Sequence, residues 1–70
     1  MTELYLYQYG ERIPLDIIVV ESVNPLRLAS RFIRWMNHMG SRYCGSYPVL
    51  SRVEVYQDKH LIGSRRYRSH

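Results

Sequence analysis

Apolar and polar residues alternate near both ends of this chain and follow a helical period between them. Residues 4–9 read Leu-Tyr-Leu-Tyr-Gln-Tyr, a period of two that is typical of a strand with two different faces. Residues 13–21 are rich in β-branched side chains and predict a second strand, which follows a turn at residues 9–12 with Gly10 free to take positive φ. Because the connection is short, we expect the two strands to pair as an antiparallel hairpin.

A helix is predicted to begin at Asn24 and Pro25. Asn is a favoured N-cap, and Pro suits the first helical position because its missing N–H would be unpaired there anyway. The helix should run from Pro25 to about Met39, where Gly40 would supply a C-terminal stop. Its apolar face covers about half of the helical wheel, wide enough to pack on a sheet. That face comprises Leu28, Phe32, Trp35, Met36 and Met39, widened by Leu26, Ala29 and Ile33.

The remaining elements complete an α+β domain. Residues 41–48 read as a loop, and residues 49–57 alternate again and predict a third strand. A tight turn at Asp58 and Lys59 would let residues 60–62 pair back as a fourth strand that ends at Gly63. The predicted order is β-β-α-β-β, an antiparallel sheet with one helix packed on one face. We expect a single domain over residues 1–63 and a basic C-terminal tail over residues 64–70.

One helix covers only one face of the sheet, so the alternation assigns side chains to faces. Leu4 and Leu6 are expected under the helix, together with Val49, Val53 and Val55. The second strand is apolar on both sides, which predicts a central position. The uncovered face would then present one set from the second strand and the following residues: Tyr5, Tyr7, Tyr9, Leu50, Arg52, Glu54 and Tyr56.

Two interpretations of this tyrosine-rich face stay open. Tyrosines are good strand residues, and they stack across strands while their hydroxyl groups remain in water. Tyr and Arg are also enriched at the centres of protein interfaces, which favours a docking face. A homodimer that packs sheet on sheet would satisfy both interpretations.

Charge is distributed unevenly, although the formal net charge is only +4. Four of the six carboxylates lie in residues 1–21, whereas nine of the ten basic side chains lie in residues 22–70. All but one of the basic side chains are arginines, which form forked contacts with phosphates and carboxylates and stack on rings. This bias favours recognition of an anionic partner, nucleic acid or acidic protein.

A basic stripe is the strongest functional feature of the sequence. Arg27, Arg31, Arg34 and His38 follow the i, i+4, i+7, i+11 spacing of one helix face, within an arc of about 60°. No acidic residue occurs between residues 22 and 53. The stripe is either a solvated helix face or a contact surface for an anion.

Further candidates lie beside the stripe. Trp35 borders it and is expected to pack in the core, or alternatively to stack on a base or fill a partner's pocket. Arg52 follows the helix in sequence, and Arg65, Arg66 and Arg68 are predicted to form a mobile cluster in the tail.

Signatures of catalysis and of metal binding are not found in the sequence. It contains no Gly-rich phosphate loop, no His-Glu-x-x-His and no Cys-x-x-Cys. His38, His60, His70 and Cys44 lack a regular metal-ligand spacing. Cys44 with His38 as base would be a nucleophile, but a lone cysteine is more often a small half-buried apolar residue. We therefore expect a non-enzyme with no metal and no cofactor.

Location is predicted from the termini and the cysteine content. A single cysteine and an N-terminus without signal-peptide character fit a reducing cytoplasm. The longest apolar run, residues 17–20, is far too short to cross a membrane.

The architecture resembles that of small phage-encoded proteins that disable host machines, such as anti-CRISPR proteins and phage inhibitors of host RNA polymerase. The resemblance rests on the hairpin, on Val20-Glu21-Ser22 leading into a helix with Leu28-Ala29 on its inner face, and on the strand over residues 49–56. It implies a steric inhibitor that acts in the host cytoplasm by occupying a surface of a host protein or ribonucleoprotein complex.

Three hypotheses follow from these patterns. The first is a protein-binding inhibitor of the phage type, which docks through the tyrosine face or the arginine stripe. The second is a nucleic-acid-binding module in which the stripe and the tail contact RNA or DNA phosphates. The third is a subunit that is stable only as a homodimer.

Overall fold

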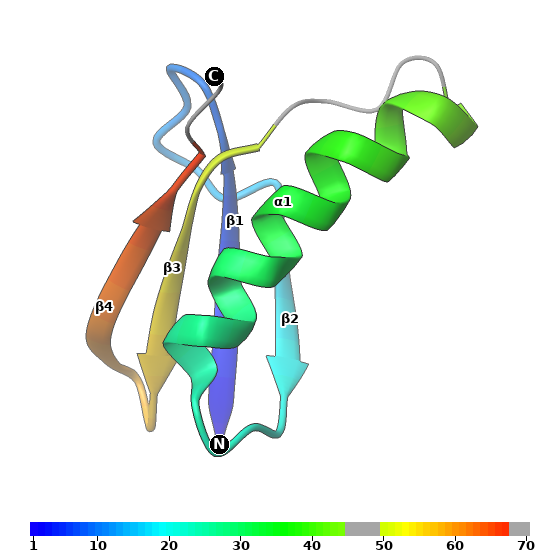
Figure 1. Cartoon of the computed structure of the whole chain (residues 1–70). Coiled ribbons are helices and arrows are strands. Elements are labelled where there is room, and N and C mark those ends of the chain that lie inside the picture. The colour runs from blue at the N-terminus through cyan, green and yellow to red at the C-terminus, as the bar shows by residue number, and fades with distance from the viewer. Residues whose placement is uncertain (45–49, 68–70) are drawn as a thin grey trace.

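The computed structural model describes the backbone of residues 1–44 and 50–67 and the side chains of residues 1–37 and 50–67. Its elements follow the order β1 (Thr2–Gln8), β2 (Asp16–Val20), α1 (Pro25–Cys44), β3 (Leu50–Gln57) and β4 (His60–Arg66). The strands form one antiparallel sheet in the order β2-β1-β3-β4, and α1 crosses one face of it (Figure 1). The predicted α+β class and element order are confirmed.

The core lies between α1 and the two central strands. The buried apolar side chains of β1 and β3 are Leu4, Leu6, Leu50, Val53 and Val55. They pack against three residues of the helix, Ala29, Ile33 and Met36. Burying this apolar surface is the main stabilising contribution in so small a domain. The buried positions of the helix show that its inner face is centred on Ala29 and Ile33, and not on Phe32 and Trp35.

The helix begins as predicted but continues past its predicted end. Asn24 caps it, since Asn24 Oδ1 accepts a hydrogen bond from the Arg27 amide at 3.2 Å. The prediction of an end near Met39 is wrong, because α1 runs through Gly40 to Cys44. A glycine inside a helix costs only about 1 kcal/mol relative to alanine, so Gly40 alone does not terminate it.

The second strand is shorter than predicted and lies at an edge of the sheet. It begins at Asp16 instead of Ile13, because Pro14 has no N–H to donate to a ladder. The predicted central position is wrong, since β1 takes that place and pairs with both β2 and β3. Ile17 and Val19 on its outer side are consequently 44% and 59% exposed.

A bulge in the pairing of β1 with β3 decides which residues at the start of β3 face the helix. Tyr7 pairs with Arg52 and Gln8 pairs with Leu50, so Ser51 is an extra residue and the alternation shifts there. Leu50, predicted on the outer face, is therefore fully buried in the core. Val49, predicted to be in the core, lies outside the described residues.

The last strand continues beyond its predicted end at Gly63 as far as Arg66. Arg65 and Arg66 therefore belong to the sheet and not to a mobile tail, while Arg68 lies outside the described residues. Strand pairing with β3 accounts for the difference, because the ladder partners Arg65 with Val53 and Arg66 with Arg52. The predicted tight turn is present, with φ of 50° at Asp58 and 67° at Lys59.

Candidate docking surfaces

The arginine stripe, Arg27, Arg31 and Arg34, is exposed on the outside of α1. It lies about 160° around the helix from the buried face, Ala29, Ile33 and Met36. None of the three guanidinium groups has an acidic partner in the described part of the chain, where the ion pairs are Met1–Asp58 and Arg52–Glu54. The side chain of His38, the fourth predicted member, lies outside the described residues.

The first turn of the helix makes the stripe electrostatically costly. That turn contains no acidic residue, so Arg27 meets the positive end of the helix dipole without compensation. Arg27 and Arg31 also form a like-charge i, i+4 pair, which destabilises a helix by a few tenths of a kcal/mol. A shallow hollow of about 290 Å³ lies beside both arginines, between them and the loop at Ser22 and Val23. The stripe thus offers unpaired guanidinium groups around an open depression.

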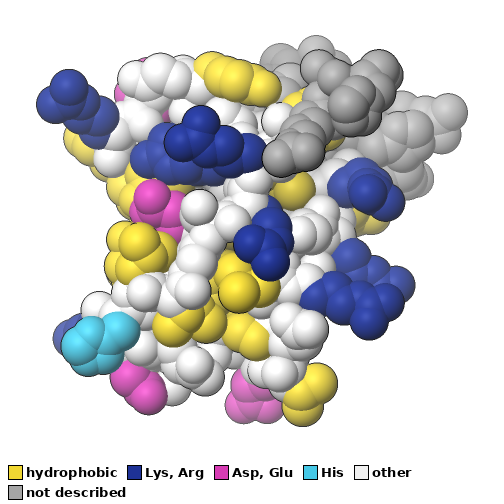
Figure 2. All heavy atoms as spheres, turned by 60° about the vertical axis from the view of Figure 1, so that its left-hand side comes forward, with side chains coloured by type: hydrophobic (Ala, Val, Ile, Leu, Met, Phe, Trp, Pro, Cys, Tyr) yellow, Lys and Arg dark blue, Asp and Glu magenta, His cyan; other side chains and the backbone are white. Residues whose placement is uncertain are grey.

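Basic side chains continue from the helix towards the β4 edge. Figure 2 brings this side of the molecule forward and shows Lys and Arg side chains spread across it, with the acidic ones at the left and lower margins. Arg65 is exposed and points to the helix side of the sheet, because its ladder partner Val53 is a core residue. Arg65 therefore extends the basic surface of α1 onto β4.

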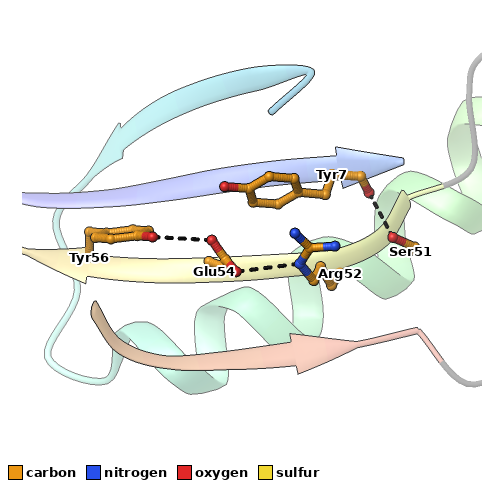
Figure 3. Close-up of polar contacts among 5 residues, drawn as sticks. All are labelled: Tyr7, Ser51, Arg52, Glu54 and Tyr56. Atoms are coloured by element: carbon orange, nitrogen blue, oxygen red, sulfur yellow. Dashed lines mark hydrogen bonds and ion pairs between the residues drawn. The ribbon is translucent and has the colours of Figure 1, made fainter. Parts of the chain in front are cut away.

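The outer tyrosines contact one another and their neighbours within the sheet. The rings of Tyr5 and Tyr56 lie 4.2 Å apart between centroids, and the guanidinium carbon of Arg52 lies 3.9 Å from the centroid of Tyr7. Glu54 links the two groups, since it accepts hydrogen bonds from Arg52 Nε at 3.4 Å and from the Tyr56 hydroxyl at 3.2 Å (Figure 3). This row stabilises the uncovered face of β1 and β3.

These contacts change the proton affinity of two phenols. Burial raises the pKa of Tyr7 to about 12, and the nearby Glu54 carboxylate adds to the rise. Burial and Glu54 also raise the pKa of Tyr56. The predicted outer position of Tyr7 is correct for its backbone, but Arg52 covers the ring and leaves Tyr7 only 6% exposed. The stacking interpretation therefore accounts for Tyr5, Tyr7, Tyr56 and Arg52, and it does not account for Tyr9, which is 65% exposed.

Trp35 is not a core residue, contrary to the prediction. Its side chain is 57% exposed, and its ring centroid lies 6.3 Å from that of Phe32. The helix is rotated so that Ala29 and Ile33 take the inner position, which turns Trp35 out of the interface with the sheet. An exposed tryptophan next to a basic stripe is available for contact with a partner.

The sequence-based prediction missed a second group of basic and aromatic residues, because this group forms only through strand pairing. Arg52 and Arg66 face each other across β3 and β4, and Tyr9 and Tyr67 lie beside them around one hollow. Tyr67 was not a candidate, and Arg66 was expected in a tail. Only the register of β4 brings these residues together, and no local sequence pattern encodes that register.

The described side chains include no group of three His, Cys, Asp or Glu residues with the geometry of a metal site. The predicted alternative nucleophile Cys44 and its base His38 lie outside the described side chains. In the described part of the chain, no helix combines the length and hydrophobicity that crossing a bilayer requires.

Comparison of this chain with protein-family models, with curated proteins and with solved structures finds no match.

Proposed function

We propose that this protein is a small non-catalytic binding protein that docks on an anionic macromolecular surface through its arginine stripe. The single observation that carries the proposal is the exposed row of Arg27, Arg31 and Arg34, without a carboxylate partner among the described residues. A fold that tolerates the repulsion within this row and an unfavourable helix dipole gains from an anion that neutralises both.

The partner that we propose is a host protein or ribonucleoprotein complex, blocked by occupation of its surface. This part of the proposal rests on the architectural resemblance to small phage-encoded inhibitors. The exposed Trp35, beside the stripe, would add an aromatic anchor to the electrostatic attraction. Such an inhibitor would work without catalysis.

A nucleic acid is the alternative partner, and the continuation of positive charge onto β4 favours it. Arg65 enlarges the basic surface from one helix to two elements, which suits an extended run of phosphates. Arginine also contacts phosphates through two parallel N–H groups, whereas lysine acts as a point charge.

Affinity capture from a bacterial lysate, with and without nuclease, tests the docking proposal. The test protein carries Arg31→Glu and Arg34→Glu, and the matched control carries Arg12→Glu and Lys59→Glu, an equal charge change at exposed sites away from the stripe. We expect a partner captured by the wild type and by the control but not by the stripe variant. Equal capture by both variants would remove any role of the stripe.

Nuclease treatment and salt separate the two partners. A protein that is still captured after nuclease treatment supports the inhibitor, whereas nucleic acid captured without any accompanying protein supports the alternative. For a duplex of defined sequence, the slope of log K against log salt should fall by about one for each phosphate-contacting arginine removed. A protein interface anchored by Trp35 should depend much less on salt.

A further inference from the structure

A hollow of about 300 Å³ opens at the end of the sheet remote from the β3–β4 turn. Its walls come from the residues that follow β1, from the start of β3 and from the end of β4 with the residue after it: Tyr9, Gly10, Ser51, Arg52, Arg66 and Tyr67. No carboxylate is among these residues. The volume is at the lower end of the range for small-molecule sites. Two arginines and the exposed Tyr9 therefore line a depression that fits a small anion carrying a ring, whereas the side chain of Tyr67 packs against the core.

The two arginines of this hollow are cross-strand neighbours of like charge. Arg52 and Arg66 are direct partners in the β3–β4 ladder, so both side chains leave the sheet on the face away from α1. Arg66 has no ion pair within the described residues, and the bond from Arg52 to Glu54 uses Nε alone. Figure 3 shows the terminal nitrogens of Arg52 without a hydrogen bond to any residue drawn. An anion between the two guanidinium groups would bring negative charge to Arg66 and fill the free donors of both arginines.

Arg52 is also held in place before any ligand arrives. Its guanidinium group packs on the Tyr7 ring, and Glu54 fixes its Nε. A donor that is already oriented loses less conformational freedom on binding. Arg52 therefore serves as the fixed half of an anion clamp, and the exposed Arg66 as the movable half.

An aromatic side chain beside the arginine clamp indicates that the ligand also carries a ring. Tyr9 is 65% exposed and lines the hollow, so its ring is available for stacking. Next to it, Gly10 adopts φ of 77°, and apart from its chain neighbours Tyr9 and Glu11 no described residue has an atom within 4 Å of the place where a Cβ would stand. The hollow is therefore not crowded by other chain segments at Gly10.

We propose that this hollow binds a nucleoside 5′-monophosphate, with the phosphate between Arg52 and Arg66 and the base against Tyr9. The same group occurs as a free nucleotide and as the 5′ end of a nucleic-acid strand. The site lies on the sheet face opposite α1, so it is independent of the arginine stripe and of the proposed function.

The test is an NMR titration of the full ¹⁵N-labelled chain with uridine 5′-monophosphate, uridine and inorganic phosphate as separate probes. The nucleotide should shift the amides of Gly10, Ser51 and Arg66, and it should bind about tenfold more tightly than either of the other probes. Equal affinity for nucleotide and uridine, or shifts confined to α1, would overturn the proposal.

Neighbouring arginines of β4 provide a matched pair of variants. Arg66→Gln should weaken nucleotide binding about tenfold, whereas Arg65→Gln removes the same charge from the opposite face and should leave binding nearly unchanged. Similar weakening by both would mean unspecific attraction and would overturn the site. Arg66→Gln also removes one of two facing charges, so we expect it to fold, and circular dichroism checks this.

Tyr9 gives a second, separate test. Tyr9→Phe should keep the nucleotide affinity, while Tyr9→Leu should lower it about fivefold and leave the affinity for inorganic phosphate unchanged. An unchanged nucleotide affinity in Tyr9→Leu would overturn the stacking position.

Oligonucleotides distinguish the two sources of the ligand. If a 5′-phosphorylated hexauridylate binds more tightly than the mononucleotide, the strand end is the ligand, and equal affinity points to the free nucleotide. Equal binding of the phosphorylated and unphosphorylated hexamers would overturn the proposal.

Discussion

Asn37 on α1 and Leu50 at the start of β3 are joined by two reciprocal hydrogen bonds. Asn37 Nδ2 donates to the Leu50 carbonyl oxygen at 2.9 Å, and the Leu50 amide donates to Asn37 Oδ1 at 2.7 Å. One side-chain amide thereby satisfies both backbone groups of the first residue of β3 and ties the helix to the sheet beside the core.

Replacing Asn37 by alanine should destabilise the protein. Both polar groups of the buried Leu50 backbone would lose their partner, which costs about 1–3 kcal/mol in the free energy of unfolding. Urea denaturation followed by circular dichroism measures the change. Arg34→Ala, at an exposed position of the same helix, serves as control and should stay within about 0.5 kcal/mol of the wild type. Equal stability of the two variants would show that the paired bonds contribute nothing.

Because Leu26 packs closely against Gly63, substitutions at these two positions should have coupled effects on the free energy of unfolding. A Cβ at position 63 would lie 2.7 Å from Cδ2 of Leu26, so Gly63→Ala overpacks this contact between α1 and β4. The expected loss is about 1 kcal/mol, since the end of the leucine side chain can partly give way.

Combining Gly63→Ala with Leu26→Ala should relieve this clash. In a double-mutant cycle the two losses of unfolding free energy should be less than additive, by about 0.5–3 kcal/mol. Strict additivity would contradict direct contact between the two positions. The control for Gly63→Ala is Ser64→Ala, the neighbouring position on β4. Gly10→Ala would be a poor control, because the positive φ of Gly10 would itself strain an alanine.

The raised pKa of Tyr7 predicts that the protein loses stability at high pH. Its pKa is about 12 in the folded protein, above the ordinary value of 10.0. The folded state therefore holds the phenolic proton more tightly than the unfolded state, and its contribution is fully present below about pH 10. Stability should fall as the pH rises from about 10 to 12, and the fall should be smaller in Tyr7→Phe. The difference between the two proteins in urea denaturation at each pH isolates Tyr7 from the other titrating groups; identical profiles would contradict its burial beneath Arg52.

The outer sheet face provides a prediction about self-association. Ile17, Val19 and Leu61 are 44%, 59% and 55% exposed on one face of the sheet, and apolar side chains gathered on an exposed face often mark an interaction site. If the homodimer hypothesis holds, light scattering at low micromolar concentration should give twice the 8.4 kDa of the chain. Ile17→Lys with Val19→Lys should return it to the monomer mass, while Arg31→Glu should not. A strict monomer for the wild type would remove this hypothesis.

The arginine stripe and the arginine clamp differ in how far sequence alone predicts them. The stripe follows from helical periodicity, and Arg27, Arg31 and Arg34 are exposed as that period requires. The clamp depends on which residues of β3 and β4 pair. A bulge between Val55 and Tyr56 shifts that register, so counting along the chain does not place Arg66 opposite Arg52.

Local physical chemistry determined the elements, their order and the charge on the helix. Alternation at Leu4 and Leu6, the cap at Asn24 and the turn at Asp58 each act over a few residues, so the sequence displays them directly.

Tertiary structure decided the order of the strands, the edge position of β2, the burial of Leu50, the exposure of Trp35 and the extension of β4 through Arg66. Each of these depends on free energy gained between residues distant in sequence, through ladder hydrogen bonds, bulges and the rotation of the helix on the sheet. A periodic pattern is compatible with several such arrangements, and only packing of the whole chain selects one.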